Sequence, residues 1–249
     1  MNLRDIRSEC WDIARETATN DQDRLWSTSE MNRYINRTYR QIARETRCIK
    51  DAQTVSLCLL DSPVVDYTTL TPGTMDYIWA NDPNSWLYHK DVTPFTYPLD
   101  PVILDVDEVK WTTRQWRLTK VSVKKWQVNP WWEQVIGMPT EFCTDYSNNT
   151  LTLNFRSEVA DTMRLIVRRL PIVDLILDTD IPEFRTHYHD FIRFGVLEQM
   201  YSKQDSQAFD ATKATEFGTR FKADLDEIKQ SEAQLDERLR PNHSTAAFR

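Results

Sequence analysis

Glycine is scarce in this chain: the 249 residues include only four, at positions 73, 137, 195 and 218. A loop that binds phosphate needs several glycines close together, because the backbone amides must approach the phosphate. The four glycines are too widely spaced to build such a loop. The sequence therefore excludes a P-loop and a dinucleotide-binding fingerprint.

Cysteine and histidine form no metal or redox motif. The cysteines are Cys10, Cys48, Cys58 and Cys143. Their spacings match no zinc or redox pattern, so we expect reduced thiols. Two histidines stand two positions apart, at 187 and 189, whereas helical metal pairs stand three or four apart. We expect no metal and no cofactor.

Catalytic patterns are missing as well. No serine or cysteine stands in a nucleophile-elbow context. Asp174, Asp178 and Asp180 lack the glycine and the terminal glutamate of a calcium-binding loop, and helix capping accounts for Asp180. We therefore predict that the protein is not an enzyme.

Long apolar runs are also absent, and none reaches the length that spans a membrane. Arg4, Asp5 and Arg7 stand where a signal peptide needs its apolar region. We expect a soluble protein that is made in the cytoplasm and has no membrane partner.

The most informative feature that is present is a set of five arginines spaced four and three residues apart. On an α-helix these steps confine them to a band of roughly 80°. We call this set the arginine face: Arg33, Arg37, Arg40, Arg44 and Arg47. Apolar residues take the opposite side, so the segment is predicted to be an amphipathic helix. Ser27 and Glu30 form a capping box at its start, with Trp26 as a hydrophobic staple.

A cationic face on a chain of net charge −7 requires an anionic partner. Acidic residues of the last predicted helix offer one, in the same chain or in a neighbouring copy: Asp224, Asp226, Glu227, Glu232, Asp236 and Glu237. DNA phosphates are the other candidate. A merely solvated face stays open as the third interpretation.

The middle of the chain changes from helical periodicity to alternation. Strands are predicted at Thr54–Leu60, Ile103–Trp111, Arg117–Val128, Thr150–Phe155 and Met163–Leu170. Residues 146–149 are predicted to form a tight turn, because Asn148 and Asn149 tolerate positive φ. Trp131 and Trp132 follow Asn129-Pro130, so we expect this pair to lie on a loop and contact another protein.

Helical periodicity appears at both ends of the chain. A first helix is predicted from Leu3 to Thr17, and a third starts with Asp180 as N-cap, Pro182 in the first turn and Glu183 closing a capping box. The last helix runs from Asp205 or Ser206 to about Arg240. Apolar residues recur in it every seven positions, at Ala214, Phe221, Ile228 and Leu235, and such a narrow stripe fits packing against one neighbouring helix.

These patterns predict an α+β fold. An α-helical bundle is formed by N-terminal helices (1–51) and C-terminal helices (172–240), with a β-rich insertion domain (52–171) between them. Residues 241–249 form a flexible C-terminal tail.

Three stretches of the chain resemble the head-to-tail adaptor (connector) proteins of tailed bacteriophages, particularly the dodecameric tail-tube adaptors of short-tailed phages. They are Trp26–Thr46, Gly137–Phe142 with the Asn148-Asn149 turn and Leu151–Phe155, and Leu170 through Asp180-Ile-Pro-Glu into the aromatic helix. The resemblance implies a structural virion protein at the head–tail junction, in a ring of twelve copies that joins the portal to the tail and lines the DNA exit channel.

The resemblance also implies the partners. They are neighbouring copies, the portal protein, tail nozzle or fibre proteins, and the genomic DNA that passes through the channel. The C-terminal segment is implied to dock on the portal. We expect Arg240, Phe248 and Arg249 to take part in this contact, and Trp131 and Trp132 to meet a tail protein. The alternative is a nucleic-acid-binding protein that uses the arginine face.

Overall fold

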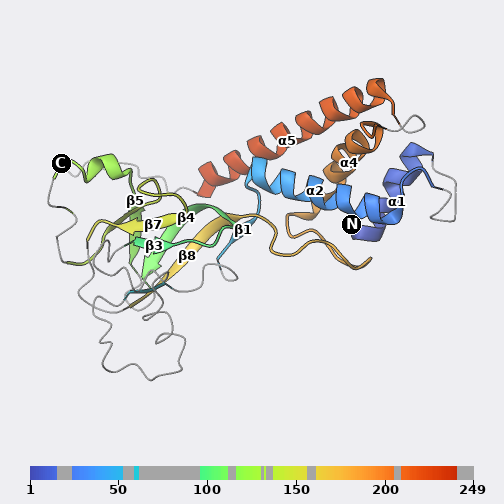
Figure 1. The fold of residues 1–249 in the computed structure, drawn as a ribbon. Helices are drawn as coiled ribbons and strands as arrows, with labels where there is room; N and C mark the ends of the chain where they lie inside the picture. Colours follow the sequence, from blue (N-terminus) through green and yellow to red (C-terminus); the bar gives the residue numbers. More distant parts are fainter. Residues whose placement is uncertain are drawn as a thin grey trace. The chain divides into compact units, whose positions relative to one another are not determined.

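The computed structural model describes residues 1–15, 24–52, 59–61, 96–111, 116–129, 132, 137–155, 161–204 and 209–239 (Figure 1). The fold is α+β, as predicted. The chain divides into two compact units: Met1–Ile49 with Arg169–Arg249, and Lys50–Arg168. We call the first the helical unit and the second the sheet unit.

The first two helices begin where local capping places them. Helix α1 (Leu3–Ala14) starts at Asn2, whose side chain accepts from Asp5 N while the Asp5 carboxylate accepts from Asn2 N. Helix α2 (Thr28–Thr46) starts with the predicted Ser27–Glu30 capping box. Each reciprocal cap satisfies two backbone amides that the first helical turn leaves unpaired.

The third predicted helix begins later than expected, and Asp180 is not its N-cap. The Asp180 carboxylate instead accepts from the backbone amides of Ile176 and Leu177, both at 2.8 Å. A 3₁₀ helix, η4 (Thr186–Phe191), and helix α4 (Ile192–Tyr201) follow. Because η4 begins at Thr186 with Arg185 as its N-cap, Asp180 stands too far ahead of the helix to cap it.

The last helix, α5 (Ala211–Leu239), also begins later than predicted. Asp210 accepts from the amides of Thr212 and Lys213 and so caps its start. The expectation of a single neighbouring helix for α5 is wrong, because α5 packs against both α4 and α2. Gly195 of α4 shows how close these helices lie: a Cβ there would stand 2.6 Å from Thr38 Cγ2 and 3.0 Å from the Phe221 ring.

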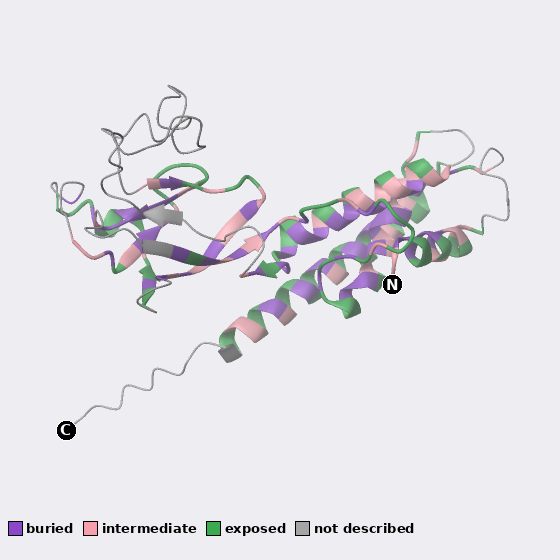
Figure 2. Ribbon diagram, turned by 90° about the horizontal axis from the view of Figure 1, so that it is seen from below, coloured by how far each residue is buried: buried purple, intermediate pink, exposed green. Residues whose placement is uncertain are grey.

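All four described helices contribute to one hydrophobic core, and buried positions recur along their inner sides (Figure 2). Its fully buried members include Leu3 of α1, Ile35 of α2, Val196 of α4 and Ile228 of α5. Trp26 is buried too, donating from Nε1 to Met200 O at 3.1 Å and meeting the Tyr201 ring edge-on. No described helix is long and apolar enough to cross a lipid bilayer.

The sheet unit is one mixed sheet with its own core. Its strands are β1 (Lys50–Asp51), β2 (Leu59–Asp61), β3 (Thr96–Pro98), β4 (Ile103–Trp111), β5 (Arg117–Lys120), β6 (Glu141–Cys143), β7 (Thr150–Leu153) and β8 (Asp161–Arg169). The order is β1-β8-β4-β5-β6-β7-β3, with β2 paired to β8. The β5–β6 pair is parallel, with Thr119 opposite Glu141.

Of the predicted strands, one is shorter than expected and another lies mostly outside the residues that the structure describes. The strand predicted for Arg117–Val128 ends at Lys120, and Val123–Lys125 form a 3₁₀ helix, η2. The Asp145 carboxylate accepts from Ser122 Oγ and Val123 N, which fixes this turn. Most of the strand predicted at Thr54–Leu60 lies outside the described residues.

Candidate protein interaction surface

The arginine face lies on the solvent side of α2. All five arginines are exposed, whereas Met31, Ile35, Thr38 and Ile42 on the opposite side are fully buried. For the four arginines within α2 the helical period produces this division, because steps of three and four return to the same side. Arg47 follows the helix as its C-cap, in a left-handed conformation with φ 53°. The packing of the helix into the core therefore leaves a continuous cationic band in water.

The arginines of this face differ in what they contact. Arg40 Nε pairs with Asp174 Oδ1 at 2.9 Å, and the Arg33 guanidinium lies 5.6 Å from the centre of the Tyr34 ring. Arg37 and Arg44 form no ion pair with any residue that the structure describes. Since the five arginines contribute +5 to a net charge of −7, the rest of the chain carries −12.

Beside the arginine face runs a non-helical segment, residues 170–182, which we call the apolar loop. Two hydrogen bonds join it to Asn36 of α2: Asn36 Nδ2 donates to Leu175 O at 2.9 Å, and Leu175 N donates to Asn36 Oδ1 at 2.8 Å. The amides of Leu3 and Arg4 at the start of α1 donate to the carbonyls of Asp180 and Asp178. The loop is thus bonded through its backbone to two helices.

Two ion pairs hold the same loop, and a third joins the residues that flank it. Arg7 of α1 reaches Asp178 at 2.8 Å with a side chain that is only 9% exposed, and Arg40 reaches Asp174. Behind the loop, Arg169 pairs with Glu183 at 2.6 Å, and Glu183 Oε1 accepts from Ile172 N. Asp174, Asp178 and Asp180, the acids that the sequence offers as candidate cation ligands, therefore hold the loop in place.

The side chains that remain outside are apolar. Five large aliphatic residues of the loop are exposed, with exposed fractions of 42–69%: Ile172, Val173, Ile176, Leu177 and Ile181. A groove of about 210 Å³ opens among Tyr39, Val173, Asp174, Leu175, Asp180, Ile181 and Glu183. At its base the Tyr39 hydroxyl accepts from Glu183 N at 2.7 Å, and burial raises the pKa of Tyr39.

Sequence reasoning missed this surface. The segment has the periodicity of neither a helix nor a strand, so no buried or exposed face can be assigned to its aliphatic residues from the sequence. The available signal was a run of aliphatic residues interrupted only by aspartates, with no period to bury them. Such a run predicts either a core strand or an exposed patch, and the sequence alone does not distinguish them.

The predicted acidic face of α5 is only partly free to bind a partner. Glu232 is buried, accepts from Tyr188 Oη at 3.1 Å and lies 3.6 Å from Arg185 Nε. Burial raises the pKa of Asp224 to about 6, and the neighbouring Glu227 raises it further. Asp226, Glu227 and Glu237 remain exposed on the outer side of the helix.

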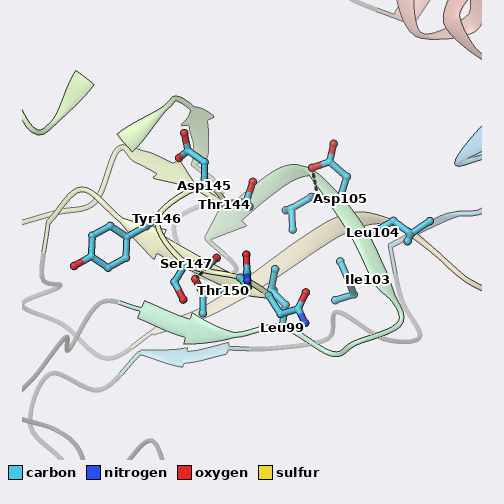
Figure 3. A pocket seen from close by; sticks show the side chains of 12 residues that line it. Leu99, Ile103, Leu104, Asp105, Thr144, Asp145, Tyr146, Ser147 and Thr150 are labelled. Atoms are coloured by element: carbon cyan, nitrogen blue, oxygen red, sulfur yellow. Dashed lines mark hydrogen bonds between the residues drawn. The ribbon is translucent and has the colours of Figure 1, made fainter. Parts of the chain in front are cut away.

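In the sheet unit a pocket of about 280 Å³ lies between the start of β4 and the turn before β7 (Figure 3). Its two carboxylates are already bonded: Asp105 pairs with Lys120 at 2.6 Å, and Asp145 accepts from Ser122 and Val123. Burial acts to raise the pKa of Asp145, but these hydrogen bonds hold it below its usual value. The described residues contain no cluster of metal-ligating side chains.

The described thiols and the imidazole of His189 occupy structural positions. Cys10, Cys48 and Cys143 are buried and free. Burial raises the pKa of Cys48 to about 11 and that of Cys143 to about 12, which keeps both thiols protonated and unreactive at neutral pH. His189 is buried, its Nε2 lies 3.0 Å from Phe184 O, and burial lowers its pKa.

The remaining predicted contact residues are buried or lie outside the description. Trp132 is 7% exposed and packs against Trp126, with ring centres 5.1 Å apart, and against Tyr146. The Trp132 side chain is therefore mostly covered within the sheet unit, and its contact with a tail protein stays a prediction. Trp131, Arg240, Phe248 and Arg249 lie outside the described residues.

Comparison with known proteins matches the chain to an adaptor family, and the members of such a family work by binding other proteins. The sequence profile of the family described as SU10 adaptor protein matches residues 1–245, nearly the whole chain. A search of curated proteins found no match. The family match is consistent with a phage head–tail adaptor, and it supports a structural role in the virion at the head–tail junction.

Proposed function

The chain belongs to the SU10 adaptor protein family, and from that premise we propose that it forms a ring between the portal and the tail of the virion. In this role the protein works by geometry: one face matches the portal, another presents a site for tail proteins, and the centre of the ring lets DNA pass. Twelve copies are the number that the resemblance to phage connectors implies.

The observation that carries the proposal is the arginine face. Arg37 and Arg44 are exposed and unpaired with any described residue, on a chain whose remaining charge is −12. A single exposed ion pair contributes only about 0–1 kcal/mol. Repetition around a ring multiplies such weak contacts, so we assign the arginine face to a neighbouring copy or to portal acids, with passing DNA as the second choice.

The test is the mass of the complex formed with the portal protein. We expect the unmodified chain to form a large ring complex and the variant R37Q/R40Q/R44Q to form it poorly. A matched control, R117Q/K124Q/K222Q, removes the same charge from exposed positions elsewhere and should assemble normally. Normal rings from the first variant would contradict the assignment of the arginine face.

The alternative function is binding of nucleic acid by a single copy. The same arginine face favours it, because phosphate contacts need cations and no base-reading geometry. Binding of this kind weakens steeply as salt rises. If the chain binds duplex DNA as a monomer in this manner and forms no complex with the portal, the alternative replaces the ring adaptor.

We also propose a division of labour within the chain. The sheet unit attaches later tail parts, whereas the helical unit binds the portal together with residues 241–249. Replacing the sheet unit, Lys50–Arg168, by a short linker tests this division, with folding of the remainder checked by circular dichroism. A folded remainder that fails to bind the portal would contradict it.

A further inference from the structure

The apolar loop has an unusual distribution of polar and apolar groups for a surface segment. Its aspartates and backbone amides bond inward to α1, α2 and each other, and five aliphatic side chains face water. Exposed apolar groups that lie next to one another mark surfaces at which proteins meet. We infer that the apolar loop is the surface through which one copy of this chain contacts the next.

The loop is organised before any partner arrives. Asn36 holds Leu175 by two hydrogen bonds, and ion pairs from Arg7 and Arg40 hold Asp178 and Asp174. Because the backbone of the loop is already ordered, binding a partner does not pay the conformational entropy of ordering it. The groove beside Tyr39 and Ile181 adds a recess for a side chain of the partner.

Charge complementarity is the reason for choosing a different surface of a second copy as the partner. The loop borders the arginine face, because Asn36 of α2 bonds to its Leu175 and Arg40 pairs with its Asp174. A two-fold contact would set two arginine faces against each other, and like charges repel. The rest of the chain carries −12, so the complementary surface belongs to another side of the neighbour.

A contact between two different surfaces repeats from copy to copy and closes into a ring when its rotation permits. Exposed acids on the outer side of α5, among them Asp226 and Glu227, are one place on the neighbour with the required charge. The inference rests on the proposed ring and deepens it, because it names the surface that the copies share.

A photo-crosslinking residue at Ile176 tests the contact directly. Ile176 is 69% exposed, so the change Ile176→p-benzoylphenylalanine leaves the core intact. The protein is illuminated alone at high concentration and in complex with the portal. We expect crosslinks between two copies of the chain in the complex. The same residue placed at Val128, which is 86% exposed in the sheet unit, serves as the control.

A second variant measures the contribution of the loop to assembly. I176D/L177D puts charge on two exposed positions and should reduce the assembled fraction by about tenfold or more, whereas V128D should assemble normally. Circular dichroism confirms that each variant is folded.

The outcomes separate this inference from the proposed function. Rings of unmodified protein in which Ile176 crosslinks only to the portal, or to nothing, overturn the inference and leave the ring adaptor standing. A chain that forms no complex with the portal overturns the proposed function. In that case copy-to-copy crosslinks of the chain alone still support the contact, and their absence overturns it.

Discussion

The helical unit and the sheet unit differ in how they satisfy their charged and apolar groups. In the sheet unit, cations on neighbouring elements neutralise the carboxylates: Lys120 pairs with Asp105, Lys125 with Glu141, and Arg168 with Asp107. In the helical unit, Arg37 and Arg44 form no ion pair with any described residue, and five aliphatic residues of the apolar loop face water. On the proposed function, these exposed groups make the helical unit the one that we assign to assembly.

The two units also have separate cores, which predicts that they unfold independently. Phe221 is 2% exposed among α2, α4 and α5, and Phe142 is fully buried in the sheet. Phe221→Ala should cost about 3–5 kcal/mol of unfolding free energy in the helical unit, through lost burial and a cavity. Hydrogen exchange measures each unit separately. The matched variant Phe142→Ala should affect the sheet unit, and equal loss of protection in both units would show a single cooperative structure.

A smaller effect is expected from Asn36→Ala, which removes both hydrogen bonds to Leu175. The amide and carbonyl of this buried residue would lose their partners, at a cost of about 1–3 kcal/mol. Hydrogen exchange should rise in residues 170–182 while the sheet unit is unchanged. Gln41→Ala, which removes an exposed bond to Glu45, is the control. Unchanged exchange in the loop would show that Asn36 does not hold it.

A dependence on pH is expected from Asp224, whose pKa burial raises to about 6. A carboxyl group with a higher pKa in the folded state binds its proton more tightly there. The helical unit should therefore lose stability as pH rises from about 4 to about 6. Partial exposure limits the effect to about 1 kcal/mol.

Asp224→Asn should remove this part of the pH dependence and stabilise the protein at pH 7. Denaturant unfolding at several pH values measures both effects. Asp226→Asn, an exposed neighbour, is the control. A variant that is less stable than the parent at pH 7 would mean that the Asp224 charge is favourable, through Arg193 or Arg220.

The smallest change in stability is expected from truncation after Arg240. The removed residues lie outside the described part of the chain and follow the end of α5 at Leu239. Thermal stability should stay within about 0.5 kcal/mol of the parent, while attachment to the portal weakens. Pull-down with the portal protein measures the second effect. Attachment as tight as that of the full chain would remove the tail from the proposed docking surface.

Much of the local structure was predictable because it depends on residues close in sequence. Ser27 and Glu30 set the start of α2, and the spacing of its arginines and apolar residues sets which side is buried. Alternation in Ile103–Trp111 gave the bounds of β4 correctly. In α2 the helical period turns the sequence pattern directly into a face. In β4 it does not, because the buried residues Ile103, Val106, Val109 and Trp111 do not alternate with the others.

The apolar loop and its surroundings were decided by tertiary contacts. Asp180 looks like an N-cap, but its carboxylate bonds to the amides of Ile176 and Leu177 because the loop folds back there. That path depends on Asn36, 139 residues from Leu175, and on Arg7, 171 residues from Asp178. The sequence by itself determined an arginine face on a capped helix. Only the folded chain placed five aliphatic side chains beside it, because the groups that hold the loop lie on helices far away in sequence.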